Sequence, residues 1–320
     1  MERRSPGRAS RFGASALTFG AVVVAAAVAA TSLGAAGPRY TDWSAPMNLG
    51  STVNGSASES APAISKNGLS LYFYSNRAGG FGSNDIWVSQ RASTDDAWGQ
   101  PVNLGATVNS ASMDFVPALS RDEHWLFFAS DRPGGHGAQD IWASYRKHVH
   151  DDFGWQAPVN LGPNVNSSAD DNASTYFEND GGAPQLIFGS GRIGGANRSL
   201  FLSSLQPDGT WGPATPIAEL NFAGFTQNRP SIRHDGLEIY FYSNRPGGFG
   251  GNDIWVATRD STDAPWSRPV NIGASVNTSA AEQHPYLSPD GKTLYFSSDR
   301  AGGSGALDLY ASTRTKTHGH

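Results

Sequence analysis

A phrase that opens on tryptophan returns at a nearly constant interval, and this repeat constrains the fold more than any other feature of the chain. The phrases WSAPMNLG, WGQPVNLG, WQAPVNLG, WGPATPIAEL and WSRPVNIG begin at Trp43, Trp98, Trp155, Trp211 and Trp266, 55–57 residues apart. A period of this length is typical of structural units that bury their apolar faces against neighbouring copies. We therefore expect a repeat protein.

Each unit contains short strands separated by glycine-rich turns. In the last unit HPYLS, TLYFSS and DLYAST are three candidate strands, and the tryptophan phrase supplies a fourth. The second strand is apolar on both faces in every unit (LYFYS, LFFAS, LIFGS, IYFYS and LYFSS), so a neighbouring sheet must cover each face. Five units of four antiparallel strands predict an all-β fold, a five-bladed β-propeller.

The two ends of the repeat complement each other. The last unit ends at DLYASTR without a fourth strand, whereas the first tryptophan phrase precedes any complete unit. We expect residues 43–49 to complete the last blade and close the ring, because an open solenoid would need polar caps at both ends. The propeller then spans residues 43–314, with a short linker at 37–42 and a disordered tail at 315–320.

The units resemble TolB-type, WD-like β-propeller repeats. The phrases HPYLSPDGKTLYFSSDRAGG and NDIWVATR carry this resemblance, which covers about Trp43 to Arg314. It implies the propeller fold. It implies little about activity, because that family spans binding modules, periplasmic scaffolds and domains attached to enzymes.

Residues that recur in every blade are expected to serve the blade. An Arg-Xaa-Gly-Gly phrase occurs at Arg77, Arg132, Arg192, Arg245 and Arg300, and aspartates open the third strands at Asp85, Asp140, Asp253 and Asp308. We expect structural ion pairs or backbone contacts for both series, with cation sites in the glycine-rich loops as the alternative. Trp87, Trp142, Phe201, Trp255 and Tyr310 share one register and are expected in the core between blades.

The candidate site lies at one position of the innermost strands. There the five units carry Glu59, Asp114, Asp171, Gln227 and Glu282, which should face the channel axis near one mouth. Like charges repel, so these acids need a partner: the Arg77 series, a Ca²⁺ ion in the channel, or a ligand. Arg229 and His284, two positions further along, add a cation and a titratable ring. These seven residues form the predicted ligand site, with no assigned metal ligand or cofactor.

We expect an exported binding or scaffold module that recognises a carbohydrate, a peptide or a partner protein at the channel mouth or on its loops. We expect binding rather than catalysis. The alternative is a glycoside hydrolase or lyase in which Asp114, Asp171 and Glu282 provide the acid and the base or nucleophile. An enzyme of this kind needs two carboxylates about 5–9.5 Å apart that are free of arginine.

Two segments depart from the repeat. KHVHDDFG contains His148, His150, Asp151 and Asp152, which either ligate zinc or form an exposed polar loop. The third unit has Ser199 in place of the repeated aspartate, and PIAELNFAGF in place of the PVNLG phrase. This lapse marks either a contact surface or sequence drift.

Residues 1–36 combine an arginine-rich start, an apolar alanine-rich run and a small-residue end. This pattern predicts a signal peptide, or an N-terminal membrane anchor if it is not cleaved. Either outcome places the propeller in the periplasm or outside the cell. The net charge of −5 argues against nucleic acid as a partner. The absence of cysteine excludes disulfides and thiolate metal sites. We expect a monomer.

Overall fold

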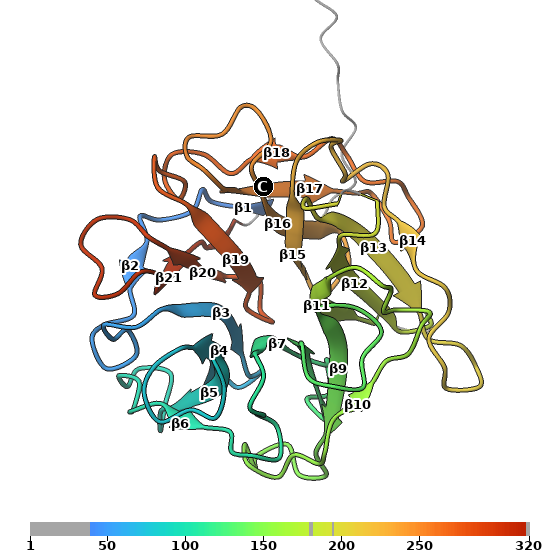
Figure 1. The fold of residues 1–320 in the computed structure, drawn as a ribbon. Helices are drawn as coiled ribbons and strands as arrows, with labels where there is room; N and C mark the ends of the chain where they lie inside the picture. The colour runs from blue at the N-terminus through green and yellow to red at the C-terminus, as the bar shows by residue number, and fades with distance from the viewer. Residues whose placement is uncertain (1–38, 179–181, 194, 318–320) are drawn as a thin grey trace, which may run out of the picture. The chain divides into compact units, whose positions relative to one another are not determined.

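The computed structural model describes residues 39–178, 182–193 and 195–317, which form strands and turns and no helix. Five four-stranded antiparallel sheets are arranged as blades around a central axis (Figure 1). This is the five-bladed propeller that the repeat predicts. Each sheet runs outward from an innermost strand, and consecutive strands of one unit pair with each other. In four blades all the strands are joined by hairpins, so each of these blades is one continuous stretch of chain; the last blade takes its outermost strand from the N-terminal segment.

The blades are numbered one to five by their innermost strands, which are β3 (Glu59–Ile64), β7 (Asp114–Leu119), β11 (Asp171–Phe177), β15 (Gln227–Ile232) and β19 (Glu282–Leu287). The second strands are β4 (Ser70–Ser75), β8 (Trp125–Ser130), β12 (Gln185–Ser190), β16 (Glu238–Ser243) and β20 (Thr293–Ser298). The third strands are β5 (Asp85–Gln90), β9 (Asp140–Tyr145), β13 (Ser199–Ser204), β17 (Asp253–Thr258) and β21 (Asp308–Thr313). The outermost strands are β6 (Val102–Asn103), β10 (Val159–Asn160), β14 (Thr215–Pro216), β18 (Val270–Asn271) and β2 (Met47–Asn48).

The N-terminal segment closes the ring as predicted. Strand β2 pairs with β21, with Met47 opposite Ala311 and Asn48 opposite Tyr310. A second pairing differs from the expected linker and tail: β1 (Arg39–Tyr40) pairs with β22 (Lys316–Thr317). Residues expected to be a linker and a disordered tail therefore form a two-stranded ribbon, because each supplies the backbone partner of the other. The last three residues lie outside the described part.

The second strands are buried on both faces because each is covered by the neighbouring blades. Phe73, Phe128, Phe188, Phe241 and Phe296 occupy the same position of these strands and are 0–1 % exposed. The five aromatic residues of the third strands, from Trp87 to Tyr310, are also buried, as predicted. Each such side chain contributes roughly 1.5–3 kcal/mol to folding.

A repeated contact between arginine and tryptophan joins the outer parts of the blades. An arginine directly follows the third strand in four blades, and its guanidinium lies over the ring of a phrase-opening tryptophan. The pairs and their centroid distances are Arg91–Trp98 (4.2 Å), Arg146–Trp155 (4.4 Å), Arg259–Trp266 (4.2 Å) and Arg314–Trp43 (4.6 Å). Each contact is favourable because the ring face carries negative potential. Blade three has Leu205 at this position, bridged to Trp211.

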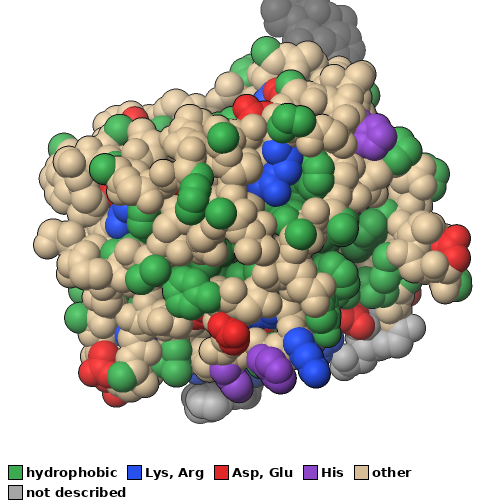
Figure 2. All heavy atoms as spheres, turned by 60° about the horizontal axis from the view of Figure 1, so that its bottom comes forward, with side chains coloured by type: hydrophobic (Ala, Val, Ile, Leu, Met, Phe, Trp, Pro, Cys, Tyr) green, Lys and Arg blue, Asp and Glu red, His purple; other side chains and the backbone are tan. Residues whose placement is uncertain are grey.

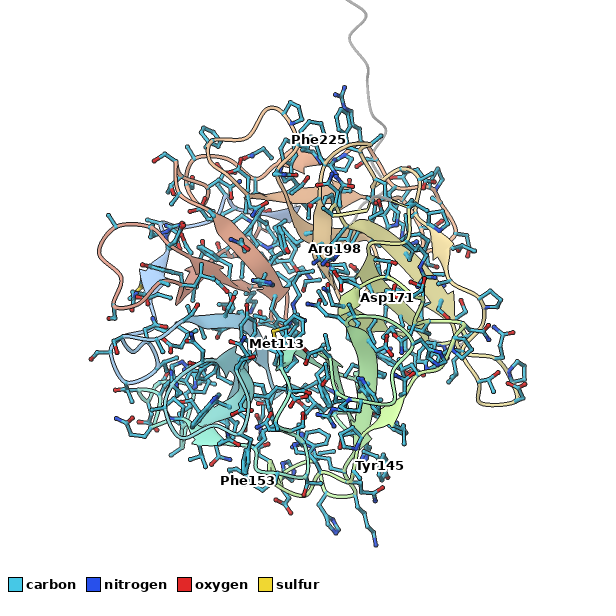
Figure 3. The ribbon with its side chains drawn as sticks, in the orientation of Figure 1. Met113, Tyr145, Phe153, Asp171, Arg198 and Phe225 are labelled. Carbon is cyan, nitrogen blue, oxygen red and sulfur yellow. The ribbon has the colours of Figure 1, made fainter. Side chains whose placement is uncertain are left out.

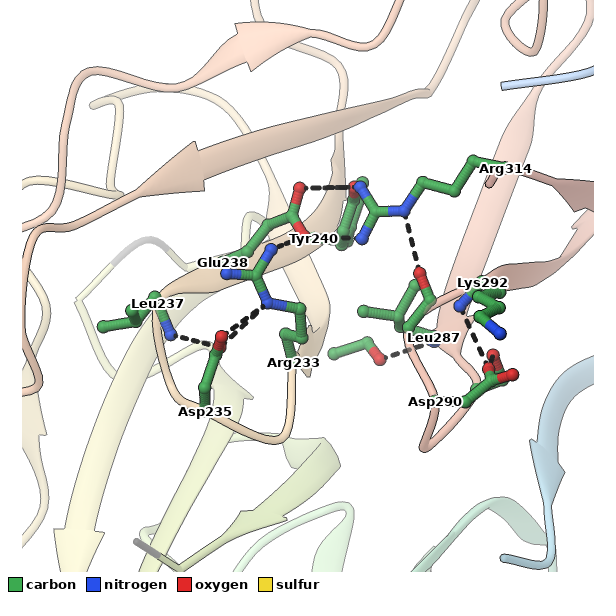
Figure 4. Close-up of polar contacts among 12 residues, drawn as sticks. Arg233, Asp235, Leu237, Glu238, Tyr240, Leu287, Asp290, Lys292 and Arg314 are labelled. Carbon is green, nitrogen blue, oxygen red and sulfur yellow. Dashed lines mark hydrogen bonds and ion pairs between the residues drawn. The ribbon is translucent and has the colours of Figure 1, made fainter. Parts of the chain in front are cut away.

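Buried ion pairs extend two of these contacts across a blade interface. In Figure 4 the Glu238 carboxylate lies between Arg233 and Arg314, at 2.7 Å from each guanidinium. Because Arg314 follows the last long strand, β21, this network ties blade five to blade four. Asp152 lies 2.8 Å from Arg146 within blade two and reaches blade one by accepting hydrogen bonds from Ser70 and Tyr72.

The predicted signal peptide or anchor at 1–36 lies outside the described residues. In the part that the structure describes, no helix has the length and apolar character needed to cross a membrane.

Candidate functional site

The acids predicted to form the site are bonded to arginine. Four carboxylates, each with a side chain that is 0 % exposed, meet the arginine of their own blade: Glu59–Arg77 (2.9 Å), Asp114–Arg132, Asp171–Arg192 (2.6 Å) and Glu282–Arg300 (3.0 Å). Of the three partners considered for the acids, the structure shows arginine bonded to them. In blade four Gln227 replaces the acid, and Arg245 keeps only the bond that all five arginines make to a backbone carbonyl, here that of Leu220 at 2.7 Å.

The same carboxylates also accept hydrogen bonds from the loop that leads into their strand. The backbone N–H groups of Gly55, Ser110, Ser167 and Thr278 donate to Glu59, Asp114, Asp171 and Glu282 at 2.5–2.7 Å. Each acid thus fixes a turn and an arginine at once. These buried groups hold the blade together and do not converge on the axis as an open ring of charge.

The aspartates of the third strands hold the glycine-rich loops by backbone contacts. Asp85 accepts from the N–H groups of Phe81 and Gly82, at 2.5 and 3.2 Å. A Cβ on Gly80 would lie 1.8 Å from Asp85 Oδ2, so only glycine fits there. Of the contacts we expected for this series, the backbone contacts are confirmed, and no aspartate of the series has an arginine ion pair among the described residues.

A β-bulge at the third residue of each innermost strand determines what reaches the axis. Five residues there, none of them glycine, have positive φ: Ala61 (53°), Val116 (57°), Ala173 (54°), Arg229 (51°) and His284 (52°). Non-glycine residues seldom adopt this conformation, and a bulge re-aims the side chain that carries it. Three blades therefore present small apolar groups, whereas blades four and five present an arginine and a histidine.

Arg229 crosses the axis and bonds to three other blades. Its guanidinium donates to the carbonyl oxygens of Pro117 (2.8 Å), Pro62 (3.1 Å), Val116 (3.4 Å) and Ser174 (3.4 Å). Burial lowers the pKa of Arg229 to about 10, so the group remains cationic at neutral pH. Its positive charge is balanced by carbonyl dipoles rather than by a carboxylate.

His284 lies beside Arg229 and is kept neutral. Burial, followed by the charge of Arg229, lowers the pKa of His284 to about 3. Its Nδ1 is 2.9 Å from Ser60 Oγ, which itself donates to Ser297 Oγ at 2.7 Å. Since the Ser60 hydrogen is used in that bond, Nδ1 of His284 donates and Nε2 is left as an acceptor.

His284 lines a cavity of about 380 Å³ at one mouth of the channel, which we call the axial cavity. Its polar lining includes Gln139, Asn172, Arg198, Asn228, Tyr242 and His284. Asn228 Nδ2 donates to Asn172 Oδ1 at 3.0 Å and to the Tyr242 hydroxyl at 3.1 Å. Burial raises the pKa of Tyr242 to about 12, so the lining is uncharged apart from Arg198.

Arg198 lies at the rim of the axial cavity and forms an ion pair with the carboxylate of Asp170. Figure 3 shows Arg198 and Asp171 near the middle of the ring, with Tyr145 and Phe153 at its outer edge. Arg198 Nη2 is 2.5 Å from Asp170 Oδ2, and the Asp170 side chain is 28 % exposed. Asp170 is therefore more accessible than any of the four paired acids.

The structure brings together only part of the predicted site. Arg229 and His284 meet at the axis, whereas Glu59, Asp114, Asp171, Gln227 and Glu282 are each buried within their own blade. Sequence reasoning missed Asn172, Asn228 and Tyr242. The first two directly follow the aligned acid or glutamine, in the same innermost strands, and this varying position was the signal that could have indicated them.

The described residues contain no group of three or more His, Asp and Glu that could hold a metal ion. In the KHVHDDFG segment, Asp152 is buried against Arg146 while His148 and His150 are exposed. The segment is therefore neither an assembled zinc site nor a wholly exposed loop. A Ca²⁺ ion in the channel remains a hypothesis, and at the bulge level Arg229 already supplies positive charge.

No family model matches the chain, and no curated protein matches it. Solved structures do match. An α-L-arabinofuranosidase from Podospora anserina, solved with cellotriose, has a TM-score of 0.57 at 15 % identity, over 87 % of this chain and 98 % of that one. A GH62 hydrolase solved with xylotriose gives 0.57 at 10 %, over 88 % and 98 %. An arabinanase from Bacillus subtilis gives 0.55 at 13 %, over 83 % and 96 %.

Two expectations change with these comparisons. The expectation of binding rather than catalysis is wrong, because the solved structures with this fold over nearly the same span are glycoside hydrolases. Identities this low establish the shared fold alone. The TolB-type family is not confirmed, because no family model matches the chain. What the structure shows is the five-bladed propeller.

Proposed function

We propose that this protein is a carbohydrate-active enzyme of the glycoside-hydrolase type, which takes a neutral glycan into the axial cavity. The observation that carries this proposal is the convergence of Asn172, Asn228, Tyr242 and His284 on the axial cavity. Amide, phenol and neutral imidazole groups exchange hydrogen bonds with hydroxyl groups without favouring a charged ligand. The fold shared with hydrolases solved with cellotriose and xylotriose supports the same ligand class.

The charge of the molecule agrees with a neutral ligand. On the face drawn in Figure 2, lysine and arginine side chains are few and scattered among uncharged ones, so that face offers no basic stripe for a polyanion. His284 is neutral above about pH 3 and accepts a ligand hydroxyl through Nε2. Export of the chain, predicted from residues 1–36, fits a polysaccharide substrate outside the cytoplasm.

Hydrolysis by the usual route requires two carboxyl groups at the scissile bond, one as proton donor and one as base or nucleophile. Asp114, Asp171 and Glu282 are 0 % exposed and bonded to arginine, so a ligand in the axial cavity does not reach their carboxyl groups. Asp170 is also paired with arginine, the cavity-lining Arg198, but its 28 % exposure leaves it open to a ligand. We therefore place Asp170 ahead of Asp114, Asp171 and Glu282 as the group that acts on substrate as base or nucleophile, and we assign no proton donor for the leaving group.

The experiment is a reducing-sugar assay on neutral oligosaccharides and polysaccharides, including cellotriose and xylotriose, beside a calorimetric binding measurement. The variants are Asp170→Asn, His284→Gln and Asp114→Asn. We expect Asp170→Asn to lose turnover and keep binding, and His284→Gln to weaken binding about tenfold. Asp114→Asn should lose thermal stability. Binding without turnover on every glycan would refute an enzyme, and an absence of binding would refute the axial cavity as the site.

A further inference from the structure

Blade three lacks the arginine that covers a phrase-opening tryptophan elsewhere. The backbone N–H groups of Arg91, Arg146, Leu205, Arg259 and Arg314 make the same hydrogen bond, to the residue that ends the preceding hairpin. Leu205 therefore stands at the position of the four arginines. Trp211 still packs on the second strand of the preceding blade, with its ring centroid 6.4 Å from that of Phe127. Trp211 differs from the other four tryptophans because Leu205 replaces the arginine whose guanidinium would cover one face of its ring.

That face opens into a cavity of about 520 Å³ between blades two and three, which we call the aromatic pocket. Its aromatic lining is Trp125, Phe127, Tyr176 and Trp211. Trp125 is 37 % exposed, and Phe127 and Tyr176 are stacked with centroids 5.7 Å apart. None of the residues that line this pocket carries a charge.

Polar atoms at the edge of the aromatic pocket are arranged as acceptors. Asn164 donates its Nδ2 to the carbonyl oxygen of Trp211 at 2.7 Å, so the side chain is fixed and its Oδ1 is available to a ligand. The hydroxyl of Thr210 donates to Asp208 Oδ1 at 2.7 Å, and the hydroxyl of Tyr176 donates to Glu178 Oε2 at 3.2 Å. Both oxygens therefore keep lone pairs for an incoming O–H group.

We propose that the aromatic pocket is a second glycan-binding site, in which the apolar face of a neutral sugar stacks on Trp211 and Trp125 while its hydroxyl groups donate to the acceptors at the edge. Aromatic rings with polar groups around them suit a ligand that has apolar faces and hydroxyl groups along its edges, such as a sugar. A charged ligand would lose its hydration on entering the pocket, and the uncharged lining offers no opposite charge to make up for that loss. The pocket shares no lining residue with the axial cavity.

The decisive variant is Leu205→Arg, which restores the arginine of the other blades and covers Trp211 while leaving the tryptophan in place. Trp125→Ala removes the second ring at an exposed position. Val102→Arg is the matched control, because it adds the same charge to an exposed site on blade one that lies outside the pocket. Circular dichroism and thermal melting should be unchanged for Leu205→Arg and Val102→Arg.

Binding is measured by affinity electrophoresis in gels containing soluble glucan, mannan, galactan or polygalacturonate, and by tryptophan fluorescence. We expect at least one neutral polysaccharide to retard the protein, with affinity reduced tenfold or more in Leu205→Arg and Trp125→Ala and unchanged in Val102→Arg. Polygalacturonate should not compete. Retardation equal to wild type in Leu205→Arg, or binding of indole with none of any neutral glycan, would overturn the proposal.

The axial cavity is tested separately in the same gels with His284→Gln. Loss of retardation in His284→Gln alone would refute the aromatic pocket as a glycan-binding site and would leave the proposed function intact. Loss in Leu205→Arg alone, with hydrolysis of short oligosaccharides at the wild-type rate, would support the pocket as an independent site.

Discussion

The guanidinium of Arg229, on blade four, lies 2.8 Å from the carbonyl oxygen of Pro117 on blade two and 3.1 Å from that of Pro62 on blade one. One side chain thus spans the axis and satisfies carbonyl groups that the bulges leave unpaired. Any ligand in the axial cavity must approach from the mouth where His284 and Asn228 lie. Arg229 therefore bonds four blades together across the axis, beside the His284 that lines the site.

Replacing Arg229 by methionine should lower the free energy of unfolding by about 2–4 kcal/mol. Hydrogen bonds to a charged group contribute about 1.5–3 kcal/mol each, offset here by the cost of burying the guanidinium. Urea denaturation followed by tryptophan fluorescence measures the change, and the exposed Arg268→Met provides the control. Equal midpoints for the two variants would contradict a structural role for Arg229.

His284 should make the stability of the protein depend on pH. Its folded-state pKa, about 3, lies below the usual value of 6.5, so the unfolded chain binds a proton more readily. This contribution is complete above about pH 6.5 and is lost as the pH falls toward 3, with a slope of at most about 1.4 kcal/mol per pH unit. Arg229, Tyr74 and Tyr242 face the ring and stay in one protonation state over this range.

The measurement is the difference in unfolding free energy between wild type and His284→Gln from pH 7 to pH 4. The carboxylates titrate alike in both proteins, so the difference isolates the histidine. A difference that does not change with pH would show that His284 titrates normally.

Asp114→Asn should destabilise blade two by about 2–4 kcal/mol, because it removes one partner of a buried pair and leaves Arg132 without its carboxylate. A double-mutant cycle with Arg132→Met, read by thermal melting, gives the coupling energy. A coupling near zero, together with lost turnover, would instead return Asp114 to a catalytic role.

Much of the fold could be read from the sequence because it depends on a period. The tryptophan phrases count the blades, and the missing fourth strand of the last unit predicts that Met47 and Asn48 pair with β21. Pairing of Glu59 and its equivalents with arginine was one of three partners that the sequence left open, since like charges at one position need a partner of some kind. These inferences use only spacing and charge, which the sequence shows directly.

The site could be predicted only in part because it depends on backbone conformation. Arg229 and His284 were selected because they vary among the repeats, but nothing in the sequence shows positive φ at a bulge. Without the bulge, Arg229 would not cross the axis. Leu205 was not singled out from the sequence, because its importance depends on the contact between arginine and tryptophan that the structure shows in the other four blades.

The network in Figure 4 leads to the last prediction, that Glu238→Gln loosens the closure of the ring. Glu238 is 8 % exposed. Burial alone would raise its pKa, but the bonds and charges of Arg314 and Arg233 outweigh this and lower it. The stabilisation is therefore present above the usual carboxyl pKa and is lost as the pH falls below it. At pH 7 the variant should melt several degrees lower than the exposed control Glu219→Gln, and hydrogen exchange should rise first in β21 and β2. Uniform exchange across all five blades would show that Glu238 has no special part in holding the last blade.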